Sequence, residues 1–149
     1  MKIVKNSCYG GFGISPKALQ EINKRKGKET YFFISDFEGK RKPVLQEQAE
    51  KELIWSAYSI PNPDFEKMNK PDEDGLYKTA NEYANSISYE TCRGIDRTDP
   101  DLIAVIEELG EEANGRFADL EIVEIPDDIE FEIDEYDGLE TIREKHRTW

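Results

Sequence analysis

The chain has 149 residues, of which 37% are hydrophobic and 36% charged, and its formal net charge at pH 7 is −13. This length fits one domain with its own core, and 16 aromatic residues spread along the chain argue against intrinsic disorder. The two cysteines and the single histidine follow no metal-ligand spacing, and no apolar stretch reaches the roughly 18 residues of a membrane span. We therefore expect a folded cytoplasmic protein with reduced thiols and no cofactor.

Four elements are predicted in the first part of the chain: a strand over 2–8, a helix over 16–26, a strand over 31–35 and a strand over 53–60. Ser15 and Pro16 predict the helix start, because serine is a good N-cap and proline suits the first helical position. Residues 43–52 suit either a short helix or a loop. Residues 62–75 contain prolines and many charges, which predicts a surface loop inside the domain.

The second part of the chain is predicted to hold a helix over 76–85, a strand over 87–92, a helix over 98–109 and a strand over 120–125. The third of these elements has the clearest signal. Thr98 and Asp101 have the spacing of a capping box, and Pro100 between them suits the first turn. Gly110 is expected to end this helix.

The last part of the chain predicts a β-hairpin from residue 129 onward. Apolar and acidic residues alternate there, and Asp137-Gly138 is a preferred two-residue type I′ turn. If Tyr136 pairs with Leu139, then Ile133 opposes Ile142, Glu132 opposes Arg143, Glu130 opposes Lys145 and Glu135 opposes Glu140, the last being a mild repulsion. A C-terminal helix is the competing interpretation, because Leu139, Ile142, His146 and Trp149 also fall on one helical face.

Together these elements predict an α+β fold in a single domain over residues 1–149. We expect a mixed sheet of five or six strands, two or three helices on one face, and the C-terminal hairpin at an edge.

Acidic residues are concentrated in one part of the chain. Between Asp99 and Glu140 there are 17 Asp or Glu residues in 42 positions and one base, Arg116. The negative electrostatic field of these residues repels nucleic acid and attracts basic grooves of proteins. We therefore expect partner binding through carboxylates at a helix end and on the hairpin. The expected partner-binding residues are Glu107, Glu108, Glu111, Glu112, Asp127, Asp128, Glu130, Glu132, Asp134 and Trp149. A solvated surface without a partner explains the same pattern, while the spacing of Asp127, Asp128, Asp134 and Asp137 does not match an EF-hand.

The glycine-rich segment before the first helix admits two interpretations. Backbone N–H groups at a strand-to-helix turn can hold a phosphate, but close packing also requires glycines. The segment lacks the lysine of a P-loop. The candidate ligand-binding residues are Tyr9, Gly10, Gly11, Phe12, Gly13, Ser15, Arg93 and Arg97.

Nucleophilic catalysis has one weak candidate. Cys8 and His146 could form a thiolate pair with Asp137 or Glu140 as the orienting group. A cysteine at a strand end is more often a small buried apolar residue. No catalytic motif names a reaction, and we do not expect an enzyme.

Five short segments resemble small accessory proteins of tailed phages and prophages: Cys8–Ser15, Arg97–Leu102, Glu124–Asp128, Glu135–Gly138 and His146–Trp149. The resemblance covers both ends of the chain but not residues 27–86. It implies a phage protein in the host cytoplasm that inhibits an antiviral defence factor, such as a nuclease or a signalling protein, by direct binding. A binder or hydrolase of a nucleotide-derived immune signal, using the glycine-rich segment, is the alternative, and a self-assembling phage component is a third interpretation.

Overall fold

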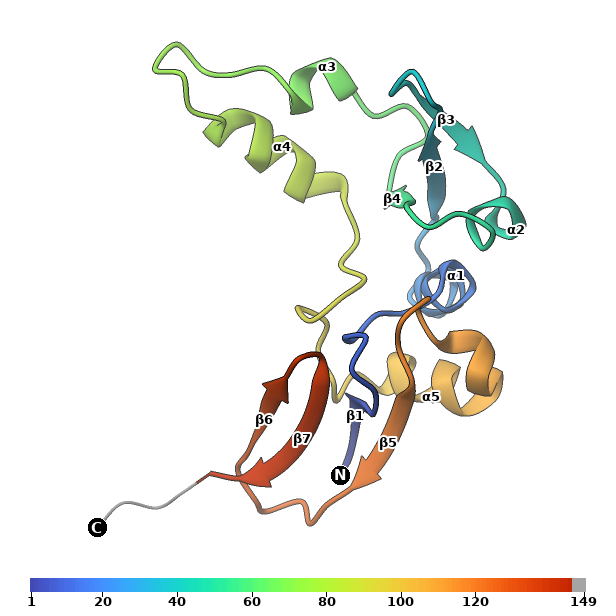
Figure 1. The fold of residues 1–149 in the computed structure, drawn as a ribbon, viewed down its shortest axis with the longest axis vertical. Helices are drawn as coiled ribbons and strands as arrows, with labels where there is room; N and C mark the ends of the chain where they lie inside the picture. The colour runs from blue at the N-terminus through green and yellow to red at the C-terminus, as the bar shows by residue number, and fades with distance from the viewer. Residues whose placement is uncertain (146–149) are drawn as a thin grey trace. The chain divides into compact units, whose positions relative to one another are not determined.

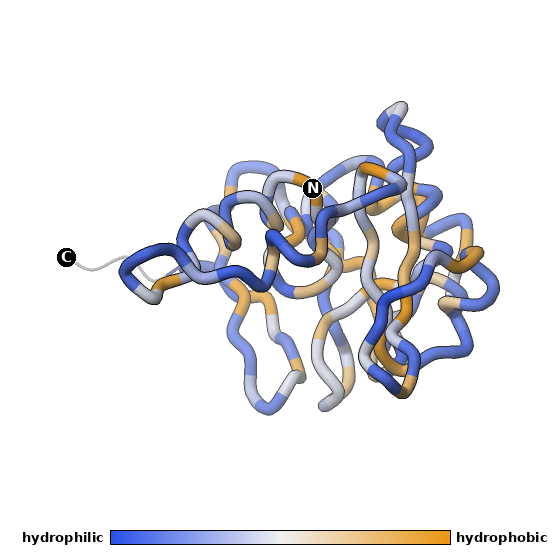
Figure 2. Tube along the Cα trace, turned by 90° about the horizontal axis from the view of Figure 1, so that it is seen from above, coloured by the Kyte–Doolittle hydropathy of each residue, from blue (hydrophilic) through white to orange (hydrophobic). Residues whose placement is uncertain are grey.

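The computed structural model describes residues 1–145 and divides the chain into two compact units (Figure 1). Unit 1 joins residues 1–26 to the chain from Glu90 onward, and unit 2 comprises residues 27–89. Five α-helices, one 3-10 helix and seven strands form in the described residues, which confirms the α+β class. Figure 2 shows short hydrophobic stretches separated by hydrophilic ones along the trace.

Unit 1 contains both long-range strand pairing and the predicted hairpin. Its elements are β1 (Lys2–Asn6), α1 (Pro16–Arg25), α5 (Pro100–Leu109), the 3-10 helix η1 (Gly110–Ala113), β5 (Leu120–Glu124), β6 (Phe131–Tyr136) and β7 (Leu139–Glu144). β1 pairs antiparallel with β5, with Ile3 opposite Val123. Helices α1 and α5 pack together, and Ile3, Leu102 and Val105 are fully buried in the core.

Local capping signals explain where both helices of unit 1 begin. The Ser15 hydroxyl accepts a hydrogen bond from the Ala18 amide at 3.1 Å, as predicted for α1. For α5 the N-cap is Asp99, whose carboxylate accepts from the Asp101 amide at 3.0 Å, so the prediction that Thr98 caps this helix is wrong. The Thr98 hydroxyl instead donates to Asp96 at 2.8 Å.

Unit 2 is built around a three-stranded antiparallel sheet in the order β3-β2-β4. Its elements are β2 (Tyr31–Ser35), β3 (Arg41–Val44), α2 (Gln46–Ala49), β4 (Ser56–Tyr58), α3 (Phe65–Met68) and α4 (Lys78–Ile87). The rings of Phe33, Tyr58 and Phe65 meet edge to face, with centroids 5.3 to 5.7 Å apart. The expected loop over 62–75 thus contains the one-turn helix α3, and the strand expected over 87–92 is reduced to a single bridge between Tyr58 and Ser88.

The seven strands form three separate antiparallel sheets instead of the single mixed sheet predicted. One reason is visible where β1 approaches β7. The amide of Asn6 donates to the Glu140 carboxylate at 2.8 Å, so a side chain occupies the position that a backbone carbonyl would have in a continuous ladder. The hairpin therefore contacts β1 without extending its sheet.

The hairpin itself forms in the predicted register. Tyr136 pairs with Leu139, Ile133 with Ile142 and Glu135 with Glu140. Asp137 and Gly138 both have positive φ angles, of 50° and 90°, as a type I′ turn requires. The competing C-terminal helix is wrong for residues 139–144, which form β7.

Candidate functional site

Most of the clustered carboxylates have basic partners within unit 1. Of the 17 acidic residues between Asp99 and Glu140, ten make ion pairs to other described residues. Many of the bases come from the first 26 residues: Lys2, Lys5, Lys17, Arg25 and Lys26. Unit 1 still holds 21 Asp or Glu against 12 Lys or Arg, a net charge of −9.

The cluster at the end of α5 is half paired. The Lys2 ammonium lies 2.7 Å from Glu107, which raises the pKa of Lys2, and the Lys17 ammonium lies 3.0 Å from Glu112. Glu108 and Glu111 are exposed and make no ion pair with any described residue. Their charges also lie at the C-terminal end of a helix, where the macrodipole disfavours anions.

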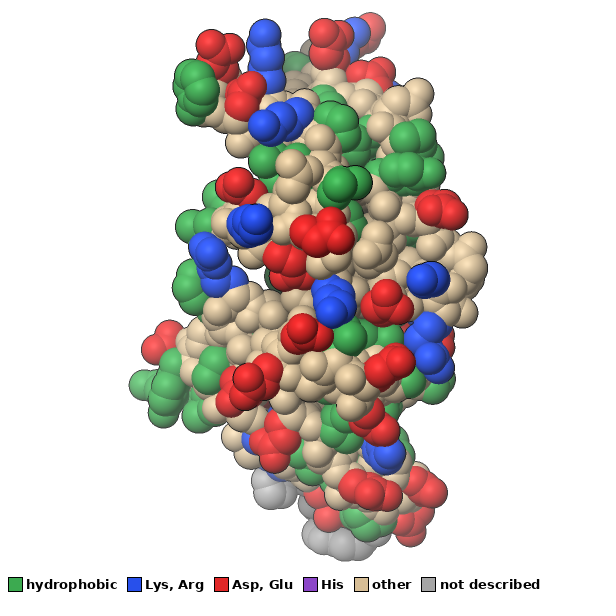
Figure 3. Space-filling model, turned by 90° about the vertical axis from the view of Figure 1, so that its right-hand side faces the viewer, with side chains coloured by type: hydrophobic (Ala, Val, Ile, Leu, Met, Phe, Trp, Pro, Cys, Tyr) green, Lys and Arg blue, Asp and Glu red, His purple; other side chains and the backbone are tan. Residues whose placement is uncertain are grey.

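The acidic residues on and before the hairpin divide in the same way. Arg143 pairs with Glu132 at 2.8 Å and with Asp134 at 2.7 Å. Asp127 binds the amine of Met1, which lowers the pKa of this carboxyl. The remaining two predicted partner-binding carboxylates, Asp128 and Glu130, are exposed and make no ion pair within the described chain. The face in Figure 3 accordingly shows red carboxylates interspersed with blue bases instead of one unbroken acidic surface.

Two predicted residues, His146 and Trp149, lie outside the described residues. The proposed pairing of Cys8 with His146 therefore stays a prediction. The Cys8 thiol donates to the Phe117 carbonyl, with sulfur and oxygen 3.1 Å apart.

The glycine-rich segment lines a pocket of about 400 Å³ together with the hairpin turn. We call it the loop–hairpin pocket, and it is lined by Tyr9, Gly10, Gly11, Phe12, Cys92, Arg93, Glu135, Asp137 and Gly138. The structure thus brings Arg93 to the segment with which the sequence associated it. Gly13, Ser15 and Arg97 do not line the pocket, whereas four lining residues, Cys92, Glu135, Asp137 and Gly138, were not among the candidates.

Close packing accounts for two glycines of the pocket, Gly10 and Gly138. A Cβ atom on Gly10 would collide with the backbone of Phe117, and one on Gly138 would collide with the backbone of Gly11 and Tyr9. The hydroxyl of Ser15 caps α1 and donates to the Glu112 carbonyl at 2.6 Å. The N-terminus of α1 is thus already capped by its own serine.

Arg97 lies beside this pocket in a buried ion pair. Its two terminal nitrogens bind the Glu140 carboxylate at 2.7 and 2.9 Å, and the two side chains are only 8% and 2% exposed. The guanidinium also lies over the Phe12 ring, 3.6 Å from its centroid. Asn6 joins the same network, because its side chain donates to the carbonyls of Cys8 and Gly138 at 2.8 Å each.

Arg93 pairs with Glu135, the hairpin glutamate directly opposite Glu140. Its guanidinium lies 2.7 Å from Glu135, whose second oxygen accepts from the Gly138 amide at 2.8 Å. The repulsion predicted between Glu135 and Glu140 is therefore offset, since each carboxylate has its own arginine. With Asp137 added, the pocket holds two carboxylates and one guanidinium, an excess of negative charge that disfavours a phosphate ligand.

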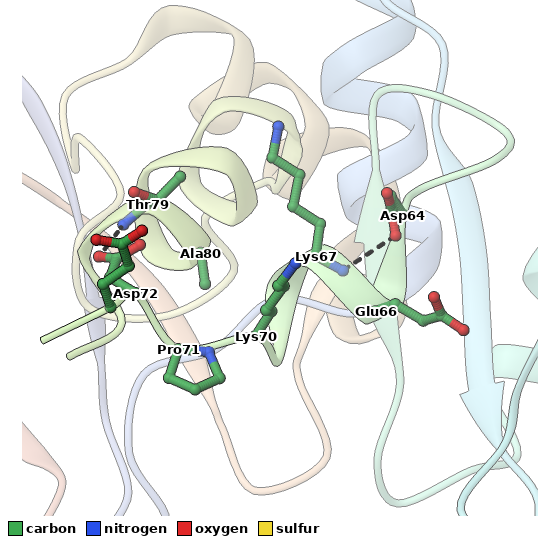
Figure 4. A pocket seen from close by; sticks show the side chains of 9 residues that line it. Asp64, Glu66, Lys67, Lys70, Pro71, Asp72, Thr79 and Ala80 are labelled. Atoms are coloured by element: carbon green, nitrogen blue, oxygen red, sulfur yellow. Dashed lines mark hydrogen bonds between the residues drawn. The ribbon is translucent and has the colours of Figure 1, made fainter. Parts of the chain in front are cut away.

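Unit 2 has a second pocket, of about 560 Å³, between α3 and α4 (Figure 4). Lys67 and Asp72 are among the charged residues that line it, and both are engaged within the unit. The Lys67 ammonium lies over the Tyr83 ring, 4.6 Å from its centroid. Asp72 accepts from the Thr79 amide at 3.2 Å near the start of α4, and the contacts with Thr79 lower its pKa. The other charged lining residues include Glu66, Lys70 and Glu73, which carry charges of both signs and do not select one ligand class.

No family model matches the chain, and no match was found among curated proteins or solved structures. Among residues 1–145, no three His, Cys, Asp or Glu side chains come together in a way that could hold a metal ion. No helix in that range has the length and apolar character needed to cross a bilayer.

Proposed function

We propose that this protein is a non-enzymatic binding protein that uses the carboxylates of unit 1 against a basic surface of a partner protein. The observation that supports the proposal is the charge left after internal pairing. Unit 1 keeps a net charge of −9, and exposed carboxylates such as Glu108, Glu111 and Glu130 have no basic partner in the described chain. Such groups attract a basic groove over a Debye length without first breaking an internal ion pair.

The mechanism that follows is electrostatic steering and then steric occlusion. Long-range attraction speeds the encounter, and the bound protein then covers the partner's groove. On the resemblance to phage accessory proteins, we propose a bacterial antiviral factor in the host cytoplasm as the target. Its basic groove would ordinarily hold nucleic acid or a nucleotide.

The competing function, binding of a nucleotide-derived signal, has less support. Arg97 is bound by Glu140 inside the protein, and the loop–hairpin pocket has more carboxylates than guanidinium groups. A nucleotide phosphate would have to overcome this excess of negative charge.

Affinity capture from a bacterial lysate tests the proposal. The wild-type chain is compared with E108K/E111K, and with E52K/E82K as a control that changes the same charge on exposed residues of unit 2. We expect the wild type and the control to capture a basic protein, and E108K/E111K to lose it. Raising the salt from about 0.1 M to about 1 M, which shortens the Debye length from about 10 Å to about 3 Å, should release it. Capture that resists both the variant and the salt would contradict the proposal.

A further inference from the structure

The loop–hairpin pocket combines an exposed aromatic ring, an unpaired carboxylate and walls that are held in place by internal contacts. Tyr9 is 63% exposed, although it lines the pocket. The Asp137 carboxylate, at the hairpin turn, makes no hydrogen bond or ion pair with a described residue. A large exposed aromatic side chain beside an unpaired charge is a common arrangement at binding sites.

The walls of the pocket are fixed by contacts that leave Asp137 free. Gly138 packs against the backbone of Gly11 and Tyr9, and its carbonyl accepts from the Asn6 side chain at 2.8 Å. Its amide donates to Glu135 at 2.8 Å, and Glu135 also holds Arg93. The Gly138 amide and carbonyl and the Arg93 guanidinium thus already have partners other than Asp137, which pre-organises the pocket for a ligand.

The charge of the pocket selects the ligand. The guanidinium of Arg93 is matched by Glu135, so the Asp137 carboxylate is the charge left over. This unpaired negative charge favours a cationic ligand. A guanidinium suits the site better than an ammonium group, because it is planar, hydrogen-bonds a carboxylate with two donors and stacks on an aromatic ring such as Tyr9.

We propose that the loop–hairpin pocket receives an arginine side chain of the partner protein, with Asp137 accepting its hydrogen bonds and Tyr9 stacking on the guanidinium. This inference rests on the proposed function, since it assigns the contact that a basic partner makes. It also gives the glycine-rich segment a role: the segment lets the hairpin turn approach closely enough to form the pocket.

Binding of a labelled oligo-arginine peptide, measured by fluorescence anisotropy, tests this assignment. The variant D137N removes the charge but keeps the turn, because asparagine also accepts a positive φ before glycine. We expect D137N to weaken oligo-arginine binding about tenfold, the effect of losing one charge-assisted hydrogen bond. Asp119 provides the matched control, since it is also an exposed carboxylate of unit 1 and lies outside the pocket, so D119N should change affinity by less than about twofold.

Two further arms separate the pocket from general charge attraction. An oligo-lysine peptide of equal length should bind more weakly than oligo-arginine, and Y9A should weaken only the arginine peptide. Equal losses in D137N and D119N, or equal binding of the two peptides, would overturn the pocket assignment. If peptide binding were still weakened by salt and by E108K/E111K, the proposed function would stand without the pocket assignment. If neither peptide bound the wild-type chain, both proposals would fail.

Discussion

The two ends of the β6–β7 hairpin carry the same kinds of charged residue in very different surroundings. At the turn end, Glu140 is 2% exposed and bound in two places by Arg97. At the open end, Arg143 and its partners Glu132 and Asp134 are 37% to 49% exposed. Burial decides what the ion pairs do: the turn end fixes the hairpin to β1 and the loop before α5, while the open end remains a solvated surface.

The largest effect expected from this comparison comes from Arg97. The substitution R97M leaves the Glu140 carboxylate buried without its counter-charge, which should lower the free energy of unfolding by about 3–5 kcal/mol. Chemical denaturation measures the loss. Adding E140Q removes the uncompensated charge and keeps an acceptor for the Asn6 amide, so the double variant should recover part of the stability. A double variant less stable than R97M would contradict the buried-charge explanation.

Gly138 should have the next largest effect. Its φ of 90° and the nearby backbone of Gly11 and Tyr9 both oppose a side chain, so G138A should lose about 2–3 kcal/mol. Gly39, in the turn between β2 and β3, is the matched control, since its φ is 84° but no atom lies within 4 Å of an added Cβ. In thermal or urea unfolding, G39A should lose only the strain, about 1 kcal/mol. Equal losses would mean that the close approach at Gly138 is unimportant.

A pH-dependent contribution is expected from Asp96, in the turn that carries Arg97. Hydrogen bonds from the amide and hydroxyl of Thr98 lower the pKa of Asp96 below its ordinary value. The ionised carboxylate therefore stabilises the fold at pH values above the ordinary pKa of an aspartate. This stability is lost as the pH falls through the depressed pKa of Asp96. We expect D96N to lower the melting temperature at neutral pH, and its difference from the wild type to shrink on acidification. A difference independent of pH would contradict this assignment.

The smallest effect is expected at the open end of the hairpin. R143Q removes an exposed ion-pair network and should change the free energy of unfolding by less than about 1 kcal/mol. Added salt should reduce even this difference, because exposed charges are screened. A loss as large as that of R97M would remove the distinction between the two ends.

The features that could be predicted from the sequence are those determined by neighbouring residues, such as turns and helix starts. The Asp137-Gly138 turn set the hairpin register because a two-residue turn determines the pairing of its flanking strands. Ser15 and Pro16 likewise placed the start of α1. Thr98 was the wrong N-cap because Asp96, two residues earlier, binds its hydroxyl, and the spacing of a capping box does not take such a competitor into account.

Contacts between distant segments could not be predicted in this way. The association of Arg93 with the glycine-rich segment was a hypothesis, and the structure places them in one pocket. The carboxylates that bind Arg93 and Arg97 come from directly opposed positions of the hairpin, which the pairing rules describe only as a repulsion. The compensating charges, Arg93 and Arg97, come from the segment before α5, and no pattern within the hairpin reveals that these arginines lie there.

The pairing of β1 with β5 also determines the order in which the chain can fold during synthesis. Ile3 needs Val123 as its partner, so the first strand leaves the ribosome long before the strand that completes its sheet. Residues 27–89 form a continuous unit whose strand pairs are local, and these can form in the meantime. Although β1 is synthesised before β5, it can acquire its native sheet only after β5 has emerged, and until then its apolar residues must be covered by something other than β5.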